Sequence, residues 1–471
     1  MEENIEYSDN EKSLVVSRYD KMLKENNAQY FDIDELDQII DFYSEKFELK
    51  RASEVIDYAL KLHPGTTSFL LKKAHIMINE GQYYTALTQL KNIARKEPSN
   101  NFVYFLKGLV YNSLGEISRA LKNFEKSVFL TYEPDEELFL NIASALQQTG
   151  QYEFAANYYK KVCEIDKENT TATFELAFCY EKINKNHESI ELYKWYLASD
   201  PYSKLAWFNL AELYNKTEDY EAAIDALEFV LAIDPTYKHA VYQKALNEVY
   251  AEKIKEGINT FKEYLIFEPT SASAFYHIGE SYAKLKKYRE ALDHFSKALQ
   301  LDNSMSDAHY GQAFILYSEK KYTDAYYSIK QAIKLDKSDP DFWHLSALIN
   351  QALGFINEAD IAFKTAIELE NSDPQIWIDY SKLEHAHKNL SKRINILSQA
   401  FEFFSDNAEI NYRLAGNLAL VSNIDSAAIH LEIALSAAPE KIGIFRSIFA
   451  IKENKLEEII EKFTLKRINP F

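Results

Sequence analysis

The chain has 471 residues, and its 53 basic and 72 acidic side chains give a formal net charge of −19. This acidity argues against nucleic-acid binding, because the sequence has no basic run to offset repulsion by the phosphates. Only 11 glycine and 10 proline residues occur, which favours a mostly helical protein with few turns.

Export and membrane anchoring are not expected. The first residues, MEENIEYSDNEKS, are acidic and contain no apolar stretch, so they do not resemble a secretory signal. No run reaches the roughly 18 apolar residues that a membrane span needs. The two cysteines, Cys163 and Cys179, lie in apolar helical patterns and are expected to be buried thiols. We therefore predict a cytoplasmic protein.

The N-terminal segment SDNEKSLVVSRYDKMLKEN predicts a helix over residues 8–26. A periodic pattern begins at about residue 33. The first unit of a repeat array has one face that no neighbour covers. We therefore expect residues 1–32 to form an N-terminal helical cap.

Small residues recur every 34 residues, with one interval of 35 and one large exception, Arg393. The series comprises Ala52, Ala86, Ala120, Ala155, Ser189, Ala223, Gly257, Ala291, Ala325, Ala359, Arg393 and Ala427. A second series lies twelve residues upstream, and it comprises Ile40, Ala74, Gly108, Ala143, Ala177, Ala211, Ala245, Gly279, Ala313, Ala347, Ser381 and Ala415. Two small positions per unit predict two closely packed helices, because a small side chain lets a neighbouring helix approach.

One position between the two predicted helices of each unit is typical of a left-handed helix end. It holds glycine in four units, at Gly81, Gly115, Gly150 and Gly354. In other units it holds a different residue, such as Asn184, Lys286 or Lys320.

Two units match one known pattern almost completely. Residues 204–235, KLAWFNLAELYNKTEDYEAAIDALEFVLAIDP, and residues 272–303, ASAFYHIGESYAKLKKYREALDHFSKALQLDN, follow W-x2-L-G-x2-Y…A-x3-F…P. The chain thereby resembles the tetratricopeptide repeat family, with about twelve repeats over residues 33–439. The resemblance implies an all-α fold, a right-handed α-solenoid superhelix of antiparallel helix pairs with a concave inner groove. It also implies a protein–protein interaction scaffold.

The eleventh unit departs from this pattern. Through Trp377, Tyr380, Glu384 and Arg393 it resembles a half-a-TPR repeat, a relative found in RNA-processing assemblies, and Glu384 and Arg393 could form an ion pair. One such unit in an acidic chain is weak support for RNA binding.

The C-terminal segment IGIFRSIFAIKENKLEEIIEKF predicts a shortened hairpin. We expect residues 440–471 to form a C-terminal capping hairpin or helix. Because the segment is more apolar than a cap requires, a contact surface for a partner or a second copy is the alternative.

Catalytic chemistry is not indicated. The sequence contains no phosphate-binding glycine loop, no dinucleotide-binding glycine motif and no H-E-x-x-H, and its cysteine spacing matches no zinc pattern. Almost every stretch belongs to a repeat or a cap. We therefore predict that the protein is not an enzyme and has no cofactor, catalytic residue or metal site.

The family resemblance places one first-helix position of each repeat on the inner groove. This aromatic column comprises Phe105, Leu140, Phe174, Phe208, Tyr242, Tyr276, Tyr310, His344, Ile378 and Tyr412. Rigid aromatic rings suit the anchoring of a partner segment, because they offer contact area at low entropic cost. Packing is the alternative, since ordinary repeats also hold aromatic residues at this position.

Acidic residues dominate the neighbouring inner positions. The acids are Asp34, Asp41, Glu45, Glu137, Glu181, Glu212, Glu280, Asp307, Asp341 and Glu409, against Lys182, Lys216, Lys284 and Lys382. The candidate binding residues are therefore Phe105, Phe174, Phe208, Tyr242, Tyr276, Tyr310, His344, Tyr412, Glu212 and Glu280. The predicted partner is a protein or peptide segment of basic character.

Two functions remain open at this point. The first is a non-catalytic adaptor that binds a partner segment in an acidic, aromatic-lined concave groove. The alternative is a self-assembling structural protein that forms homo-oligomers through its apolar C-terminal hairpin.

Overall fold

A computed structural model describes most of the chain. It covers residues 9–25, 28–133, 135–386, 389–450 and 453–468, with side chains described for all of these except 9–13, 384–386 and 464–468. The described residues form 27 α-helices and one short 3-10 helix, and no strand occurs among them. The chain is an all-α solenoid, as the sequence predicts. It divides into two compact parts, residues 1–218 and 219–471.

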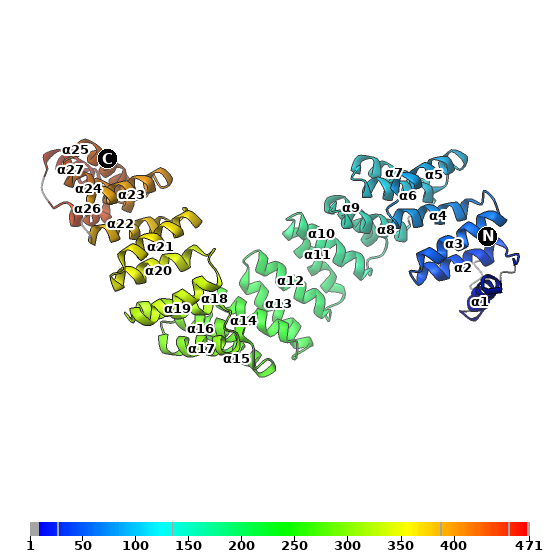
Figure 1. The fold of residues 1–471 in the computed structure, drawn as a ribbon, viewed down its shortest axis with the longest axis horizontal. Coiled ribbons are helices and arrows are strands. Elements are labelled where there is room, and N and C mark those ends of the chain that lie inside the picture. The colour runs from blue at the N-terminus through cyan, green and yellow to red at the C-terminus, as the bar shows by residue number, and fades with distance from the viewer. Residues whose placement is uncertain (1–8, 26–27, 134, 387–388, 451–452, 469–471) are drawn as a thin grey trace. The chain divides into compact units, whose positions relative to one another are not determined.

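The N-terminal part contains the first twelve helices (Figure 1). They are α1 (Asp9–Glu25), α2 (Ile33–Glu45), α3 (Leu49–Leu62), α4 (Thr67–Asn79), α5 (Tyr83–Lys96), α6 (Asn101–Ser113), α7 (Ile117–Leu130), α8 (Glu136–Gln148), α9 (Tyr152–Ile165), α10 (Thr170–Lys182), α11 (Asn186–Ser199) and α12 (Lys204–Lys216). Helix α1 packs on α2, and its buried Val16, Tyr19 and Met22 join a core with Phe31 and Ile39.

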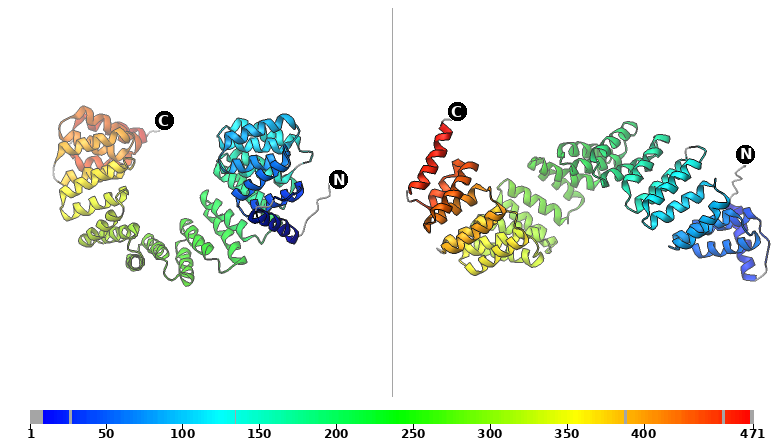
Figure 2. Two further views of the ribbon diagram at one scale, coloured as in Figure 1. Left: turned by 45° about the vertical axis from the view of Figure 1, so that its right-hand side comes forward. Right: turned by 90° about the horizontal axis from the view of Figure 1, so that it is seen from above.

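The C-terminal part contains the remaining helices, which stack one after another along the chain (Figure 2). They are α13 (Tyr220–Ile233), α14 (Lys238–Tyr250), α15 (Ile254–Phe267), α16 (Ala272–Lys284), α17 (Tyr288–Leu301), α18 (Ser306–Ser318), α19 (Tyr322–Leu335), α20 (Pro340–Leu353), α21 (Ile356–Leu369), α22 (Pro374–Ala386), α23 (Leu390–Phe403), α24 (Ala408–Leu420), α25 (Ile424–Ala437), η1 (Pro439–Lys441), α26 (Gly443–Ile448) and α27 (Asn454–Ile468).

Even-numbered helices from α2 to α24 are the first helices of the repeats, and the odd-numbered helices that follow them are the second helices. The pair α16 and α17 is representative, with 13 and 14 residues. Ser271 caps α16, since its side chain accepts a hydrogen bond from the backbone N–H of Ala274. The small residues lie where the two helices touch. A Cβ added to Gly279 of α16 would lie 2.8 Å from the ring of Phe295 in α17.

The predicted left-handed position occurs in eleven repeats at the same phase. Its φ angle is positive at Phe47, Gly81, Gly115, Gly150, Asn184, Glu218, Glu252, Lys286, Lys320, Gly354 and Ser422. Most residues other than glycine and asparagine are strained in this conformation. The neighbouring helices therefore impose the turn on whichever residue occupies it.

The eleventh repeat, α22 and α23, keeps the same hairpin despite its atypical residues. Trp377 and Tyr380 are buried, and Arg393 is 6% exposed at the position that is small in the other repeats. The side chain of Glu384 lies outside the described residues, so its predicted ion pair with Arg393 stays a prediction.

Candidate functional site

First helices of consecutive repeats contact one another across repeat boundaries. Helix α6 contacts α4 and α8, and in the C-terminal part the first helices from α14 to α24 contact one another in sequence. We call the surface that they expose away from the second helices the first-helix face. Most residues that line the two pockets described below belong to first helices.

The N-terminal pocket has a volume of about 510 Å³ and lies between α10, α11 and α12, with Gln147 of α8 at its edge. Phe174 of the aromatic column lines it together with Phe178, Tyr193 and Asn209. The ring of Phe174 packs edge-on against Tyr193, with centroids 5.4 Å apart. Asn209 Nδ2 donates a hydrogen bond to the Tyr193 hydroxyl over 3.0 Å.

Three carboxylates line the N-terminal pocket, and two of them have partners. Glu175 accepts a hydrogen bond from Gln147 Nε2 at 2.6 Å, and Glu181 lies 3.2 Å from Lys216 Nζ. The third is Glu212, whose pKa is raised by burial and by the charge of Glu181.

The C-terminal pocket has a volume of about 390 Å³ and lies between α16, α18 and α20. Its walls include Tyr276 and Tyr310 of the aromatic column, and the buried rings of Phe295 and Phe342 lie beneath them. Tyr310 stacks on Phe342 with centroids 5.1 Å apart. A Cβ on Gly311 would lie 2.6 Å from Phe295, so only glycine lets α18 approach this ring so closely.

Four carboxylates line the same pocket, and they are Glu280, Asp307, Asp339 and Asp341. Burial raises the pKa of Asp307, and the charges of Asp339 and Glu280 raise it further. The pKa of Asp341 is raised by burial and by Asp339 in the same way. Burial also raises the pKa of Tyr310 to about 12, with help from Asp341 and Asp339, so its hydroxyl stays neutral.

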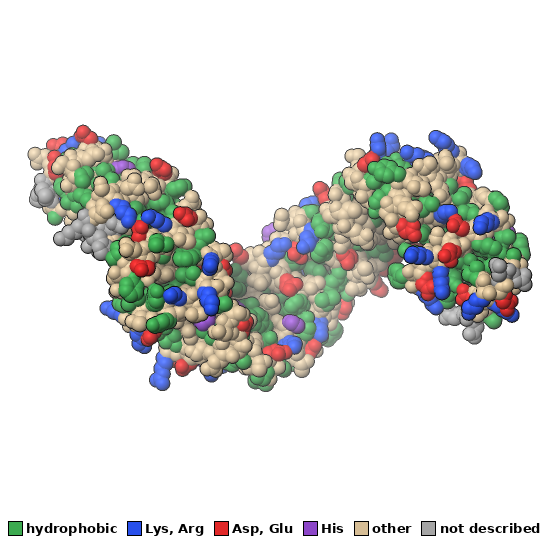
Figure 3. Space-filling view, viewed as in Figure 1, with side chains coloured by type: hydrophobic (Ala, Val, Ile, Leu, Met, Phe, Trp, Pro, Cys, Tyr) green, Lys and Arg blue, Asp and Glu red, His purple; other side chains and the backbone are tan. Residues whose placement is uncertain are grey.

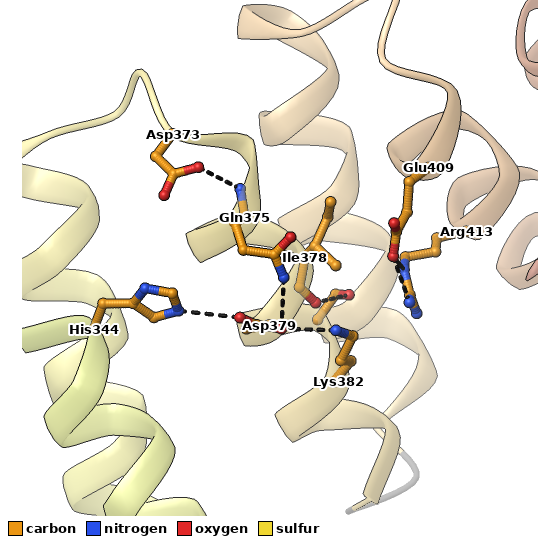
Figure 4. Close-up of polar contacts among 9 residues, drawn as sticks. His344, Asp373, Gln375, Ile378, Asp379, Lys382, Glu409 and Arg413 are labelled. Atoms are coloured by element: carbon orange, nitrogen blue, oxygen red, sulfur yellow. Dashed lines mark hydrogen bonds and ion pairs between the residues drawn. The ribbon is translucent and has the colours of Figure 1, made fainter. Parts of the chain in front are cut away.

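Further along the first-helix face, His344 of α20 belongs to a polar cluster (Figure 4). Its Nε2 lies 3.1 Å from Oδ2 of Asp379 in α22. Asp379 Oδ1 also accepts hydrogen bonds from Gln375 Nε2 at 3.0 Å and Lys382 Nζ at 2.7 Å. Burial alone would raise the pKa of Asp379, but these three donors outweigh it and hold the pKa at about 2. The charges of this cluster are thus satisfied internally.

The predicted binding residues do not form one uniform row. Phe174 and Glu212 meet in the N-terminal pocket, and Tyr276, Tyr310 and Glu280 meet in the C-terminal pocket.

The other predicted residues lie outside both pockets. Phe208 and Tyr242 are half-buried on α12 and α14, and the ring of Tyr242 contacts Phe261 with centroids 5.5 Å apart. His344 is engaged by Asp379.

Phe105 and Tyr412 are core residues. Phe105 is 7% exposed and packs against Phe124 and Phe102. Tyr412 is fully buried, and its hydroxyl donates a hydrogen bond to the backbone carbonyl of Ala438 at 2.9 Å. Neither ring is available to a partner, so neither belongs to the site proposed below.

The residues that the sequence analysis missed are Phe178 and Phe314. They line the N-terminal and C-terminal pockets and are 38% and 46% exposed. Each directly follows the small residue of its first helix, at the position that holds Glu212 and Glu280 in other repeats. Comparing that position across repeats would have found them, because most first helices place a polar or smaller residue there.

The polarity of the surface is mixed. On the face seen in Figure 3, acidic and basic side chains are interspersed with hydrophobic ones, without a large patch of one sign. Within the described residues, no group of three or more His, Cys, Asp or Glu is placed to hold a metal ion. Nor is any helix of the described chain both long and apolar enough to cross a membrane.

Known proteins resemble this chain over limited stretches. Two models of the tetratricopeptide repeat match it, one at residues 205–237 and 272–304 and the other at residues 103–129 and 136–169. The TPR repeat-containing protein MJ1428 of Methanocaldococcus jannaschii is 26% identical over 129 residues, which make up 27% of this chain. The match spans 22% of the length of that curated relative.

Solved structures also resemble the chain. Yeast Tom70 is 15% identical and matches 92% of this chain and 96% of its own, with a TM-score of 0.42. YrrB, a TPR protein with an unusual peptide-binding site, is 18% identical and matches 40% of this chain and 96% of its own, with a TM-score of 0.35.

The family models match four of the helix pairs that recur along the structure. Proteins with such repeats are generally non-catalytic scaffolds for protein–protein interaction. The chain contains tetratricopeptide repeats at these positions, and the matches indicate no specific subfamily.

Proposed function

We propose that the protein is a non-catalytic adaptor that binds a polypeptide segment of basic character on its first-helix face. The observation that carries this proposal is that each part has a pocket in which aromatic rings stand beside carboxylates. The rings sit on rigid helices, so a partner gains contact area without having to order a loop. The carboxylates favour basic side chains and disfavour phosphate groups.

The two exposed pocket rings, Phe178 and Phe314, give the sharpest test. Replacing both with Ala removes partner contact area, while exposed side chains contribute little to the free energy of unfolding. Replacing the half-buried Tyr242, Tyr276 and Tyr310 instead would remove core packing as well, because the rings of Tyr242 and Tyr276 contact Phe261 and Phe295.

A matched control replaces two exposed rings elsewhere. Phe129 of α7 is 85% exposed and Tyr327 of α19 is 65% exposed, and neither lines a pocket. The wild type and the two double variants would each be used for affinity capture from the native cell, and the captured proteins would be quantified by mass spectrometry. We expect a defined set of partners to be lost from Phe178→Ala/Phe314→Ala and kept by Phe129→Ala/Tyr327→Ala. Equal capture by both double variants would contradict binding through the pockets.

The self-assembly alternative receives no specific support. The apolar side chains of the C-terminal hairpin, including Phe445, Phe449 and Leu456, are buried against α24 and α25. Their burial favours a cap over a contact surface for a second copy.

A further inference from the structure

We propose that the C-terminal pocket binds the guanidinium group of an arginine side chain presented by a partner polypeptide. This inference rests on the adaptor function proposed above and adds the chemistry of the residue that is recognised. It is carried by a cavity on α16, α18 and α20 that combines flat rings with an excess of negative charge.

The net negative charge of the pocket favours a positively charged ligand. The pocket has four carboxylates and a single cationic side chain, Lys284. Two carboxylates are engaged by the protein itself, since Glu280 lies 3.0 Å from His277 Nδ1 and Asp339 accepts a hydrogen bond from the backbone N–H of Asp341 at 2.8 Å. Among the described residues, no ion pair is formed by the side chains of Asp307 and Asp341. Burial is the main reason why the pKa of each group is raised, and the charge of Asp339 raises both further. A cation bound in the pocket would offset this repulsion by Asp339.

The shape of the cavity selects arginine over lysine. A guanidinium group is planar and weakly hydrated, so it can stack on an aromatic ring while its edge donates hydrogen bonds to two carboxylates. The pocket offers both surfaces, because the rings of Tyr276, Tyr310 and Phe314 lie beside Asp307 and Asp341. An ammonium group is compact and strongly hydrated and would use the charge but not the rings. The volume of about 390 Å³ lies in the range of pockets that hold small ligands.

The N-terminal pocket makes a weaker case for the same chemistry. There Glu181 already forms an ion pair with Lys216, and Glu175 accepts a hydrogen bond from Gln147. Within the described part of the chain, the C-terminal pocket therefore has more carboxylates without an ion-pair partner than the N-terminal pocket, and we assign arginine recognition to the C-terminal pocket.

The test uses the full-length protein and three capped tripeptides, acetyl-Gly-Xaa-Gly-amide, in which Xaa is arginine, lysine or citrulline. Citrulline keeps the shape of arginine but is uncharged. Binding of such small probes is weak, so it would be followed by ligand-observed NMR titration. We expect the arginine peptide to bind at least threefold more tightly than the lysine peptide and the citrulline peptide to show no saturable binding.

Two double variants of equal charge locate the effect. Asp307→Asn/Asp341→Asn should weaken arginine binding about tenfold, the scale expected when a charge-assisted contact is lost. Asp293→Asn/Asp324→Asn changes two exposed acids on α17 and α19, outside the pocket, and should leave binding within twofold of the wild type. A further variant, Phe314→Arg, places a guanidinium group of the chain itself in the pocket and should also abolish binding of the arginine peptide. This variant keeps the test decisive if Asp307→Asn/Asp341→Asn does not fold.

Equal losses in the two double variants would overturn the proposal, because they would show a diffuse field rather than a pocket. Equal binding of the arginine and lysine peptides would also overturn it. If no tripeptide binds while Phe178→Ala/Phe314→Ala still loses its partners, arginine recognition fails and the adaptor function stands. If neither experiment shows a difference, both proposals fail.

Discussion

His344 Nε2 lies 3.1 Å from Asp379 Oδ2, although the two residues are 35 positions apart in the sequence (Figure 4). The contact joins the first helices of consecutive repeats. An ionised carboxylate only accepts hydrogen bonds, so the Nε2 atom of His344 must carry the proton that is shared. The geometry makes Asp379 the centre of a polar clamp between α20 and α22.

The first prediction concerns this clamp. The folded-state pKa of Asp379 is about 2, below its ordinary value of 3.8. Its stabilisation is therefore present above the ordinary pKa and is lost as the pH falls through about 2. We expect Asp379→Asn to lower the free energy of unfolding by about 2 kcal/mol at pH 7, since one pKa unit corresponds to ~1.4 kcal/mol. Urea unfolding followed by circular dichroism measures the change.

The exposed Asp293 of α17 provides the control for this measurement. Asp293→Asn should leave the urea midpoint unchanged at pH 7. An equal midpoint for Asp379→Asn and Asp293→Asn would show that the three donors around Asp379 contribute nothing net.

The second prediction concerns a buried acid whose pKa is shifted in the opposite direction from that of Asp379. Glu248 of α14 is 6% exposed, and its Oε2 accepts a hydrogen bond from Thr260 Oγ1 of α15 at 2.6 Å. Burial raises its pKa above the ordinary value of 4.5, although Thr260 and Lys244 oppose the shift. The folded state therefore keeps a proton that the unfolded chain releases, and the contribution of Glu248 declines as the pH rises above 4.5.

We expect Glu248→Gln, which is neutral at every pH, to be more stable than the wild type at pH 8 and to lose that advantage toward pH 4.5. Thermal unfolding midpoints over this range test the sign. A difference between the two proteins that does not change with pH would contradict it.

The third prediction concerns the left-handed turn. Lys320 has a φ of 62°, and Gly354 occupies the same position in the next repeat with a φ of 81°. A side chain in this conformation costs roughly 1–2 kcal/mol relative to glycine. Lys320→Gly should therefore stabilise the fold by about 1 kcal/mol, and Gly354→Ala should destabilise it by a similar amount. Unfolding midpoints that move in the same direction would contradict this account.

The fourth prediction separates a cap from an oligomer interface. A Cβ on Gly416 of α24 would lie 2.9 Å from Ile448 of α26, so α26 packs directly on α24. Deleting residues 442–471 would expose this surface of α24. We expect the truncated chain to associate more strongly than the full chain in light scattering at several concentrations. Oligomers that are present in the full chain and absent after truncation would favour self-assembly instead.

Much of the fold follows from the sequence alone because the repeat needs small residues at two fixed positions. Ala291 and Ala313, for example, are fully buried where the period places them. The candidate site is less predictable. Tyr412 is fully buried and bonded to the backbone at the end of α25, whereas Tyr276 and Tyr310 at the same repeat position line a pocket, so the period alone does not separate them. The link between His344 and Asp379 depends on side-chain orientation across a repeat boundary, so the period shows neighbouring positions but not the bond.

The interval of 35 residues falls between α7 and α8, whose bounds are Ile117–Leu130 and Glu136–Gln148. These helices keep 14 and 13 residues, as in the regular repeats. The additional residue is therefore accommodated by the connection, and neither helix is lengthened. Because both helices keep their usual length beside the longer connection, we expect a short peptide tag inserted in the connection after Thr131 to leave α7 and α8 intact.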